Sequence, residues 1–132
     1  MKEFTTKWKA SRKPNKQRKY LAKAGLKIRH NIMSAHLSKE LRTKYKRRSF
    51  PVRKGDTAMV MVGKFKKKSG KIDRVDLKKM KLTIEGIQLT KKDGTKINAV
   101  FVPSNLKLTQ LNLEDKERVN ALERNIKNKE KI

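Results

Sequence analysis

The sequence predicts a small, mainly β protein: a five-stranded antiparallel barrel with a basic arm before it and a helix after it. Five short segments rich in β-branched residues follow one another between residues 57 and 111, and turn signals such as KGD, KKSG and KKDGTK separate them. Short strands with hairpin-length connections are typical of a small barrel. The charge adds a third observation, because 38 Lys and Arg against 12 Asp and Glu leave a net charge of +26, which predicts a polyanionic partner.

Residues 1–50 form the first expected unit, a basic N-terminal arm. The arm has 17 Lys and Arg, only two acidic residues, and too few apolar residues to bury a core of its own. We therefore expect its first twenty residues to be disordered or extended until a partner orders them. Three aromatic residues interrupt the charge, and they either stack on bases or pack against the domain: Phe4, Trp8 and Tyr20.

One short helix is expected in this unit, near residues 38–45. Ser38 suits its N-cap and Glu40 its first turn. Leu37, Leu41 and Tyr45 recur every four residues and form an apolar stripe that would dock on the barrel. The helix would leave these basic residues facing outward: Lys39, Arg42, Lys46, Arg47 and Arg48.

Residues 51–111 form the expected barrel. Met80, Leu82 and Ile84 alternate with polar residues and should face the core, whereas the broken alternation of KIDRVD predicts a bulge or a bend. The other expected core residues are Val60, Val62, Leu89, Ile97, Val100, Val102, Leu106 and Leu108. A domain of about 60 residues is marginal alone, so we expect the flanking helices and a partner to stabilise it.

Residues 112–132 form the third unit, a C-terminal helix and tail. Asn112 suits the N-cap because acidic residues follow it, and lysines lie toward the other end. Val119, Leu122 and Ile126 make a narrow apolar stripe that would lie on the barrel or on a partner, and the last few residues should fray.

The sequence gives no basis for catalysis, a metal, a cofactor or a small-molecule substrate. It has no cysteine, and its two histidines, His30 and His36, have no carboxylate pair beside them. Asp73 and Asp76 would point to opposite faces of a strand. The longest apolar runs are far shorter than the roughly 20 residues of a spanning helix, so we expect no membrane insertion.

The stretch VRKGDTAMVMVGKFKKKSGKIDRVD resembles a KOW motif, a strand-loop-strand unit of several ribosomal proteins and transcription elongation factors. Three glycines match its loop geometry: Gly55 in the first turn, Gly63 after the first strand and Gly70 before the second. We call residues 63–72 the lysine loop. Lys67 departs from the pattern, which usually has glycine there, and a lysine disfavours positive φ.

The flanking segments resemble the archaeal and eukaryotic branch of the universal large-subunit ribosomal protein L-twenty-four family, called L-twenty-six-e in eukaryotes. The similarity runs from IRHNIMSAHLSKELRTKYKRRSFPVRKGD through KKDGTK and VPSNLKLTQL to LEDKERVNALERN, roughly residues 28–126. It implies a barrel of the Src-homology-three type that binds the 5′ domain of large-subunit rRNA, supports subunit assembly and sits near the polypeptide exit tunnel. The implied location is the cytoplasmic ribosome, and the implied partners are rRNA and neighbouring ribosomal proteins, with docking factors or nascent chains at the tunnel exit.

Phosphates of RNA would neutralise the positive charge of the lysine loop and of the arm. The candidates for bidentate phosphate clamps are Arg29, Arg42, Arg47, Arg48 and Arg53. For a single lysine, a solvated position is as good an interpretation as a contact. The candidate rRNA-binding residues are Lys7, Lys9, Arg12, Lys13, Lys16, Arg18, Lys19, Arg29, Arg42, Lys46, Arg47, Arg48, Arg53, Lys54, Lys64, Lys66, Lys67, Lys68 and Lys71.

A second candidate element is the hairpin tip KKDGTK. Asp93 and Gly94 predict a type I′ turn, and a plain connection is the simplest interpretation of it. By the family resemblance, the tip formed by Lys91, Lys92, Asp93 and Gly94 would point toward the tunnel exit.

Two other functions fit a KOW domain. A transcription elongation factor would place a separate globular domain before it, which residues 1–50 cannot form. A nonspecific nucleic-acid-binding protein would explain the charge without needing the loop glycines, and it predicts equal affinity for duplex DNA.

Overall fold

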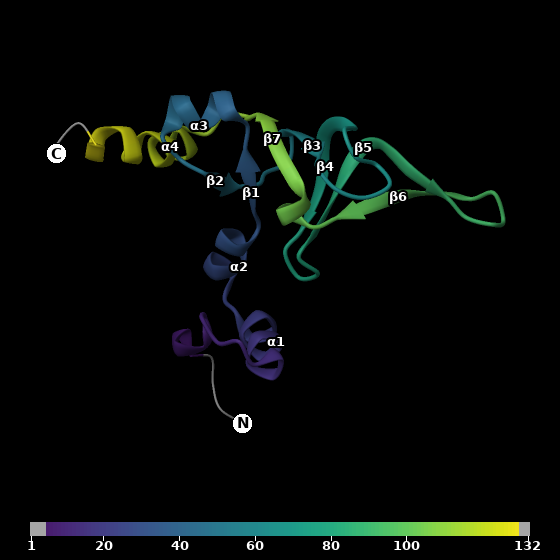
Figure 1. Cartoon of the computed structure of the whole chain (residues 1–132), viewed down its shortest axis with the longest axis horizontal. Helices are drawn as coiled ribbons and strands as arrows, with labels where there is room; N and C mark the ends of the chain where they lie inside the picture. The colour runs from purple at the N-terminus through teal and green to yellow at the C-terminus, as the bar shows by residue number, and fades with distance from the viewer. Residues whose placement is uncertain (1–4, 130–132) are drawn as a thin grey trace.

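The computed structural model describes residues 5–129, which form one curved sheet with helices at its edges (Figure 1). Within these residues the sheet has seven strands in the order β2-β1-β7-β3-β4-β5-β6. Along the chain the elements are η1 (Thr6–Trp8), α1 (Pro14–Lys23), α2 (Leu26–Ile32), β1 (Ser34–Leu37), α3 (Lys39–Tyr45), β2 (Ser49–Pro51), β3 (Thr57–Val60), β4 (Ser69–Asp76), β5 (Lys81–Thr90), β6 (Lys96–Phe101), η2 (Pro103–Asn105), β7 (Leu106–Gln110) and α4 (Lys116–Lys129).

The five predicted strands are present as β3 to β7, and the expectation of only five strands is wrong. The segment before them adds β1 and β2, and β1 pairs with β7 in parallel, so the sheet is not purely antiparallel. These strands are only four and three residues long and lie among basic residues, so they leave no clear pattern in the sequence. The expected unit boundary between residues 50 and 51 falls inside β2.

The core lies between the sheet and the elements that flank it. Residues of the first fifty contribute to it directly, because Met33, Leu37 and Phe50 are almost fully buried. From the other end of the chain, Leu122 of α4 is completely buried. The core is therefore shared between segments that cannot bury a core separately.

Four expected core residues are instead exposed. The exposed fraction is 62% for Val62, 40% for Ile97, 56% for Val100 and 44% for Val102. In β6 the inward position is taken by Ala99, and because side chains of a strand alternate between faces, Val100 must point outward. The other expectations hold: Val60, Leu82, Ile84, Leu106 and Leu108 are buried, Met80 and Leu89 are partly buried, and β4 has the predicted irregularity between residues 72 and 74.

The helix α3 forms as predicted. The Ser38 side chain caps it by accepting a hydrogen bond from the Leu41 N–H at 3.3 Å, and the apolar stripe of Leu37, Leu41 and Tyr45 packs on the core. The outward placement of Arg47 is wrong. Its guanidinium lies over the Phe50 ring and donates to the Ala121 carbonyl of α4 at 2.7 Å, because a half-buried arginine needs acceptors.

The helix α4 begins three residues later than expected from an Asn112 cap. Asn112 forms a turn before the helix, in which its side chain accepts from the Glu114 N–H at 3.0 Å. Asp115 takes the capping role and accepts from the N–H groups of Glu117 and Arg118, at 2.9 and 3.4 Å. Leu122 of the predicted stripe is fully buried, and Ile126 packs beside it. The expected frayed tail lies partly outside the described residues.

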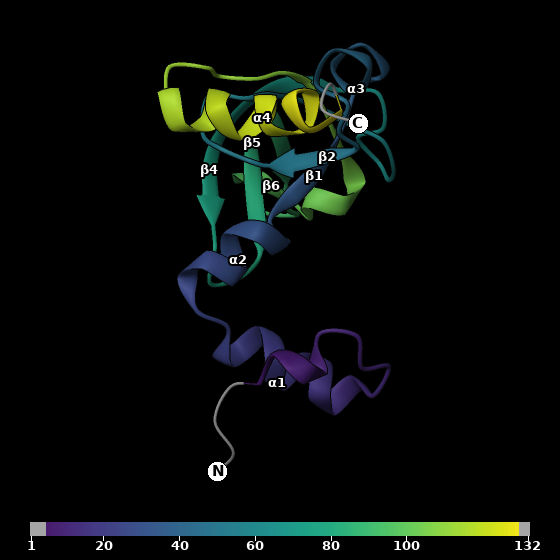
Figure 2. The same cartoon turned by 90° about the vertical axis from the view of Figure 1, so that its left-hand side faces the viewer.

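The first part of the expected arm, residues 5–32, is helical rather than extended, and we use the name arm for these residues from here on. No residue from 5 to 23 is buried, and both views place η1 and α1 away from the sheet, beyond α2 (Figures 1 and 2). Trp8 packs within the arm, where the Lys16 ammonium lies 5.8 Å from its ring centre. Phe4 lies outside the described residues.

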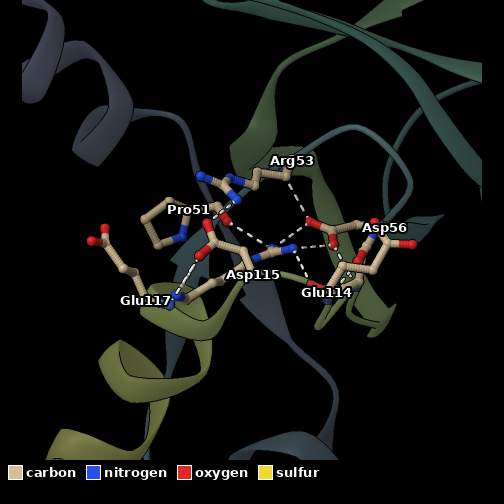
Figure 3. A network of polar contacts seen from close by, with 8 residues as sticks. Pro51, Arg53, Asp56, Glu114, Asp115 and Glu117 are labelled. Carbon is tan, nitrogen blue, oxygen red and sulfur yellow. Dashed lines mark hydrogen bonds and ion pairs between the residues drawn. The ribbon is translucent and has the colours of Figure 1, made fainter.

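A buried ion pair connects the sheet to α4 (Figure 3). The two carboxylate oxygens of Asp56 accept from the two terminal nitrogens of Arg118, each at 2.7 Å, and both side chains are almost fully buried. Asp56 also accepts from the N–H groups of Arg53 and Asn112, at 2.8 and 2.9 Å. Arg118 donates further to the Asn112 and Pro51 carbonyls, at 2.7 and 3.2 Å. Both carboxylate oxygens and both terminal guanidinium nitrogens of the pair thus have partners, as burial requires.

Removing one partner should strongly destabilise the fold. We expect Arg118→Met to lower the free energy of unfolding by about 3–5 kcal/mol, because it leaves the buried Asp56 carboxylate uncompensated. Urea denaturation followed by circular dichroism measures this. Arg124→Met, on the exposed side of the same helix, is the matched control and should change stability by less than about 0.5 kcal/mol. Equal effects of the two changes would contradict the role of the pair.

Asp115 should make stability depend on pH in the acid range. The Arg53 guanidinium, which donates to its carboxylate, holds the pKa of Asp115 below the usual 3.8, and the Glu117 and Arg118 N–H groups act in the same direction. A carboxyl whose pKa is lower in the folded state stabilises the fold above the unfolded value, and this contribution disappears as the pH falls through the folded value.

Asp115→Asn keeps an oxygen for the cap and removes the charge. We expect the wild type to lose more unfolding free energy than this variant as the pH falls from about 5 to about 2. Urea denaturation at each pH gives the comparison. Parallel curves for the two proteins would show that ionised Asp115 does not stabilise the fold.

Candidate nucleic-acid interface

The lysine loop has a fixed backbone. It follows β3, and its last four residues belong to β4. Both backbone polar groups of Val60 are hydrogen-bonded to the loop. The Val60 N–H donates to the Lys68 carbonyl and the Val60 carbonyl accepts from the Lys67 N–H, both at 2.8 Å. Within the loop, the Lys66 N–H donates to the Gly63 carbonyl at 3.0 Å. These bonds give the lysines a defined direction.

Phe65 anchors the loop to the sheet. Its ring packs edge-on against Phe101 of β6, with 6.1 Å between ring centres, and the Lys68 ammonium lies 5.4 Å from the same ring. The sequence analysis missed this residue. The sequence did contain a signal for it. Phe65 is a single aromatic residue among lysines, and a fully solvated loop has no need of an aromatic side chain.

Three positions in and beside the loop have a positive φ, and a fourth has no room for a side chain. Gly55 and Gly63 have φ of +88° and +97°, which glycine adopts without strain. Lys67 has φ of +70°, a left-handed conformation that glycine adopts more readily than lysine. Gly70 is needed for space, because a Cβ there would lie 2.7 Å from the Glu85 carbonyl oxygen of β5.

The loop lysines are exposed and uncompensated. Lys64, Lys66, Lys67, Lys68 and Lys71 have no ion pair to any described residue. Lys54 differs, since its ammonium lies 3.7 Å from the Asp73 carboxylate in an exposed pair. The loop therefore presents several positive charges from a rigid base.

Four of the five candidate arginine clamps are engaged within the protein. Arg29 donates to the Ala22 and Ala24 carbonyls, both at 2.9 Å, and Arg42 donates to the Leu37 carbonyl at 2.9 Å. Arg47, as described above, is turned inward, and Arg53 pairs with Asp115. Arg48 is exposed, and its guanidinium has no partner among residues 5–129. These bonds leave further donors on each guanidinium, but their first role is structural.

Seven candidate RNA-binding residues of the arm lie on η1, α1 and the turn between them. All are exposed except Lys16, which is partly covered: Lys7, Lys9, Arg12, Lys13, Lys16, Arg18 and Lys19. Arg18 also donates to the Asn15 side chain. Lys46 is exposed at the end of α3, with φ of +50°. Because the arm extends beyond α2, its charges and the lysine loop lie on separate parts of the molecule (Figures 1 and 2).

The hairpin of β5 and β6 projects from the sheet (Figure 1), and every residue from 91 to 98 is exposed. The predicted type I′ turn is wrong, because Asp93 does not have the positive φ that such a turn needs. Instead the Gly94 N–H donates to the Lys91 carbonyl at 3.1 Å, and Gly94, with φ of +85°, completes a three-residue loop with a bulge. Hydrogen bonding from Thr95 lowers the pKa of Asp93.

Two other kinds of feature, a metal site and a membrane-spanning helix, were sought among the described residues. No three His, Asp or Glu side chains between residues 5 and 129 are grouped so that they could hold a metal ion. In the same part of the chain, no helix combines the length and apolarity needed to cross a membrane.

Comparison with known proteins gives a consistent result. Residues 11–125 match the model of a family described as the ribosomal proteins L26 of eukaryotes and L-twenty-four-P of archaea. The chain is 46% identical over 116 residues to the large ribosomal subunit protein uL24 of Methanosphaera stadtmanae, which covers 88% of this chain and 99% of the relative. It is 44% identical over 114 residues to the large ribosomal subunit protein uL24 of Korarchaeum cryptofilum, and this match covers 86% of this chain and 87% of the relative. The chain therefore belongs to this family of eukaryotic and archaeal ribosomal proteins.

Proposed function

We propose that this protein is a structural constituent of the large subunit of the cytoplasmic ribosome, where it binds the 5′ domain of the rRNA and supports subunit assembly. The carrying observation is the lysine loop, whose backbone is fixed by Val60 and Phe65 while its exposed lysines have no partner within the described chain. A rigid, uncompensated positive surface suits the phosphates of folded RNA. The relatives carry the name of a large-subunit protein, and the family is structural rather than enzymatic.

The strands β3 to β7 correspond to a barrel of the Src-homology-three type. They lie in the order β7-β3-β4-β5-β6, and the 3₁₀ turn η2 joins the last two strands in the chain. Closure of these five strands around the core is part of the proposal. In that barrel the lysine loop connects β3 to β4, the first two strands. The surface proposed to bind RNA is therefore attached directly to the sheet.

The arm and the loop divide the work of RNA binding. The loop supplies charges at fixed positions, which can select a particular RNA shape. The arm has ten Lys and Arg and no acidic residue between positions 5 and 32, so it neutralises charge between neighbouring RNA segments. A nonspecific nucleic-acid binder would gain from the same charge but not from the fixed loop, and this difference gives the test.

We expect a clear preference for folded rRNA. Binding of a transcript of the 5′ domain of large-subunit rRNA should be tighter than binding of length-matched duplex DNA or unrelated structured RNA, at every salt concentration. If about eight phosphates are neutralised, log affinity should fall against log salt with a slope of roughly −6 to −7. Filter binding across a salt series measures both quantities. Equal affinity for all three nucleic acids would reject the proposal.

One variant separates the loop's charge from its geometry. Lys67→Gly removes a charge but suits the positive φ of that position, so the fold should stay as stable as the wild type. The salt slope should become less steep by about 0.7–0.9. Thr90→Ala, an exposed and uncharged change on β5, serves as the control and should leave the slope unchanged.

The projecting hairpin of β5 and β6 is proposed to face the tunnel exit, where docking factors and nascent chains pass. Its exposed tip has few contacts with the rest of the protein that would require it for folding. Deletion of residues 92–95 should therefore leave affinity for the rRNA transcript within about twofold of the wild type. A loss of tenfold or more in the same filter-binding assay would instead make the tip an RNA contact.

A further inference from the structure

The arm contains a hollow that the lysine loop does not explain. It lies between η1, α1 and α2 and has a volume of about 420 Å³. This is within the range of about 300–1,000 Å³ that is usual for pockets that bind small molecules. Its lining residues are Thr6, Lys9, Tyr20, Ile28, Asn31 and Ile32.

The walls of the hollow are held in place by contacts within the arm. The Lys16 ammonium of α1 lies over the Trp8 ring of η1 at 5.8 Å. On the other side, Arg29 of α2 donates to the carbonyls of Ala22 and Ala24 at the end of α1, both at 2.9 Å. The three elements are therefore tied together before any ligand arrives, which lowers the entropic cost of binding.

The lining has the chemistry that an unstacked base needs. Tyr20 supplies an aromatic ring on which a base can stack, and Ile28 and Ile32 supply apolar contact. The Asn31 side-chain amide has no partner among the described residues, and it can both donate to and accept from the edge of a base. Lys9 lies at the same hollow and can meet a phosphate.

The charge around the hollow favours a nucleotide over a side chain of another protein. The ten basic residues between positions 5 and 32 have no acidic residue among them. An apolar protein side chain would gain nothing from this field, whereas a nucleotide brings the phosphate that the field attracts.

We propose that this hollow binds one unstacked nucleotide of the rRNA, with its base on Tyr20, its edge at Asn31 and its phosphate at Lys9. The proposal rests on the proposed function and adds to it, because it makes the arm a reader of a single-stranded position rather than only a source of charge. An RNA that lacks a splayed nucleotide at this place would lose the contact.

The test compares two substitutions of one residue in the full chain. Tyr20→Leu keeps apolar volume and removes the ring, so affinity for the 5′-domain transcript should fall about 5- to 150-fold. Tyr20→Phe keeps the ring and should stay within about twofold of the wild type. Neither change alters charge, so both variants should keep the wild-type salt slope. Circular dichroism should show equal helix content.

Chemical probing of the transcript adds a readout that a general loss of arm structure would not give. One nucleotide should be protected by the wild type and by Tyr20→Phe, and should become reactive with Tyr20→Leu alone. Asn31→Ala should weaken binding, whereas Asn120→Ala on the exposed side of α4 should not.

The outcomes separate the two proposals. If the wild type shows no preference for rRNA, the proposed function fails. If the wild type prefers rRNA but Tyr20→Leu binds equally well, the function stands and the nucleotide pocket is rejected. Unchanged RNA affinity combined with poor incorporation into assembled subunits would assign the hollow to a protein side chain and would also reject it.

Discussion

The buried pair of Asp56 and Arg118 is the interaction on which the arrangement of the other elements depends. It joins β2, the turn before β3, the segment before α4 and the helix itself, because the remaining hydrogen bonds of the two side chains go to the backbone of Pro51, Arg53 and Asn112. Burying two charges is costly, and the cost is offset only when each charged atom has a partner in good geometry. That condition makes the pair specific, since a shift of α4 along the sheet would leave a charge without a partner.

The same protein carries a net charge of +26, and its parts respond to that charge differently. The sheet tolerates it because a shared core and the internal pairs hold its backbone. The arm has no buried residue from position 5 to 23 and relies on local contacts such as Lys16 over Trp8. An RNA partner therefore changes the two parts unequally: it adds stability to the arm and mainly neutralises charge on the sheet.

The sequence predicted the elements whose signals are local. Five strands and the capped helix α3 follow from alternation, caps and turn residues. Features that depend on distant partners were missed or misplaced. Nothing near Arg118 indicates that it meets Asp56, the parallel pairing of β1 depends on where β7 ends, and Val100 faces outward because Ala99 faces the core. Arg47 and Arg53 bind the Ala121 carbonyl and the Asp115 carboxylate, which only the folded chain brings near.

The position of β7 has a consequence for how the protein comes into being. This strand lies between β1 and β3, yet it is made after every other strand, and Arg118 is separated from Asp56 by 62 residues. A chain that emerges from its amino end therefore exposes both halves of the sheet before the strand that joins them exists. The sheet cannot be completed while the earlier strands are being synthesised. Until β7 has been made, the unpaired edges of β1 and β3 are open to association with other chains.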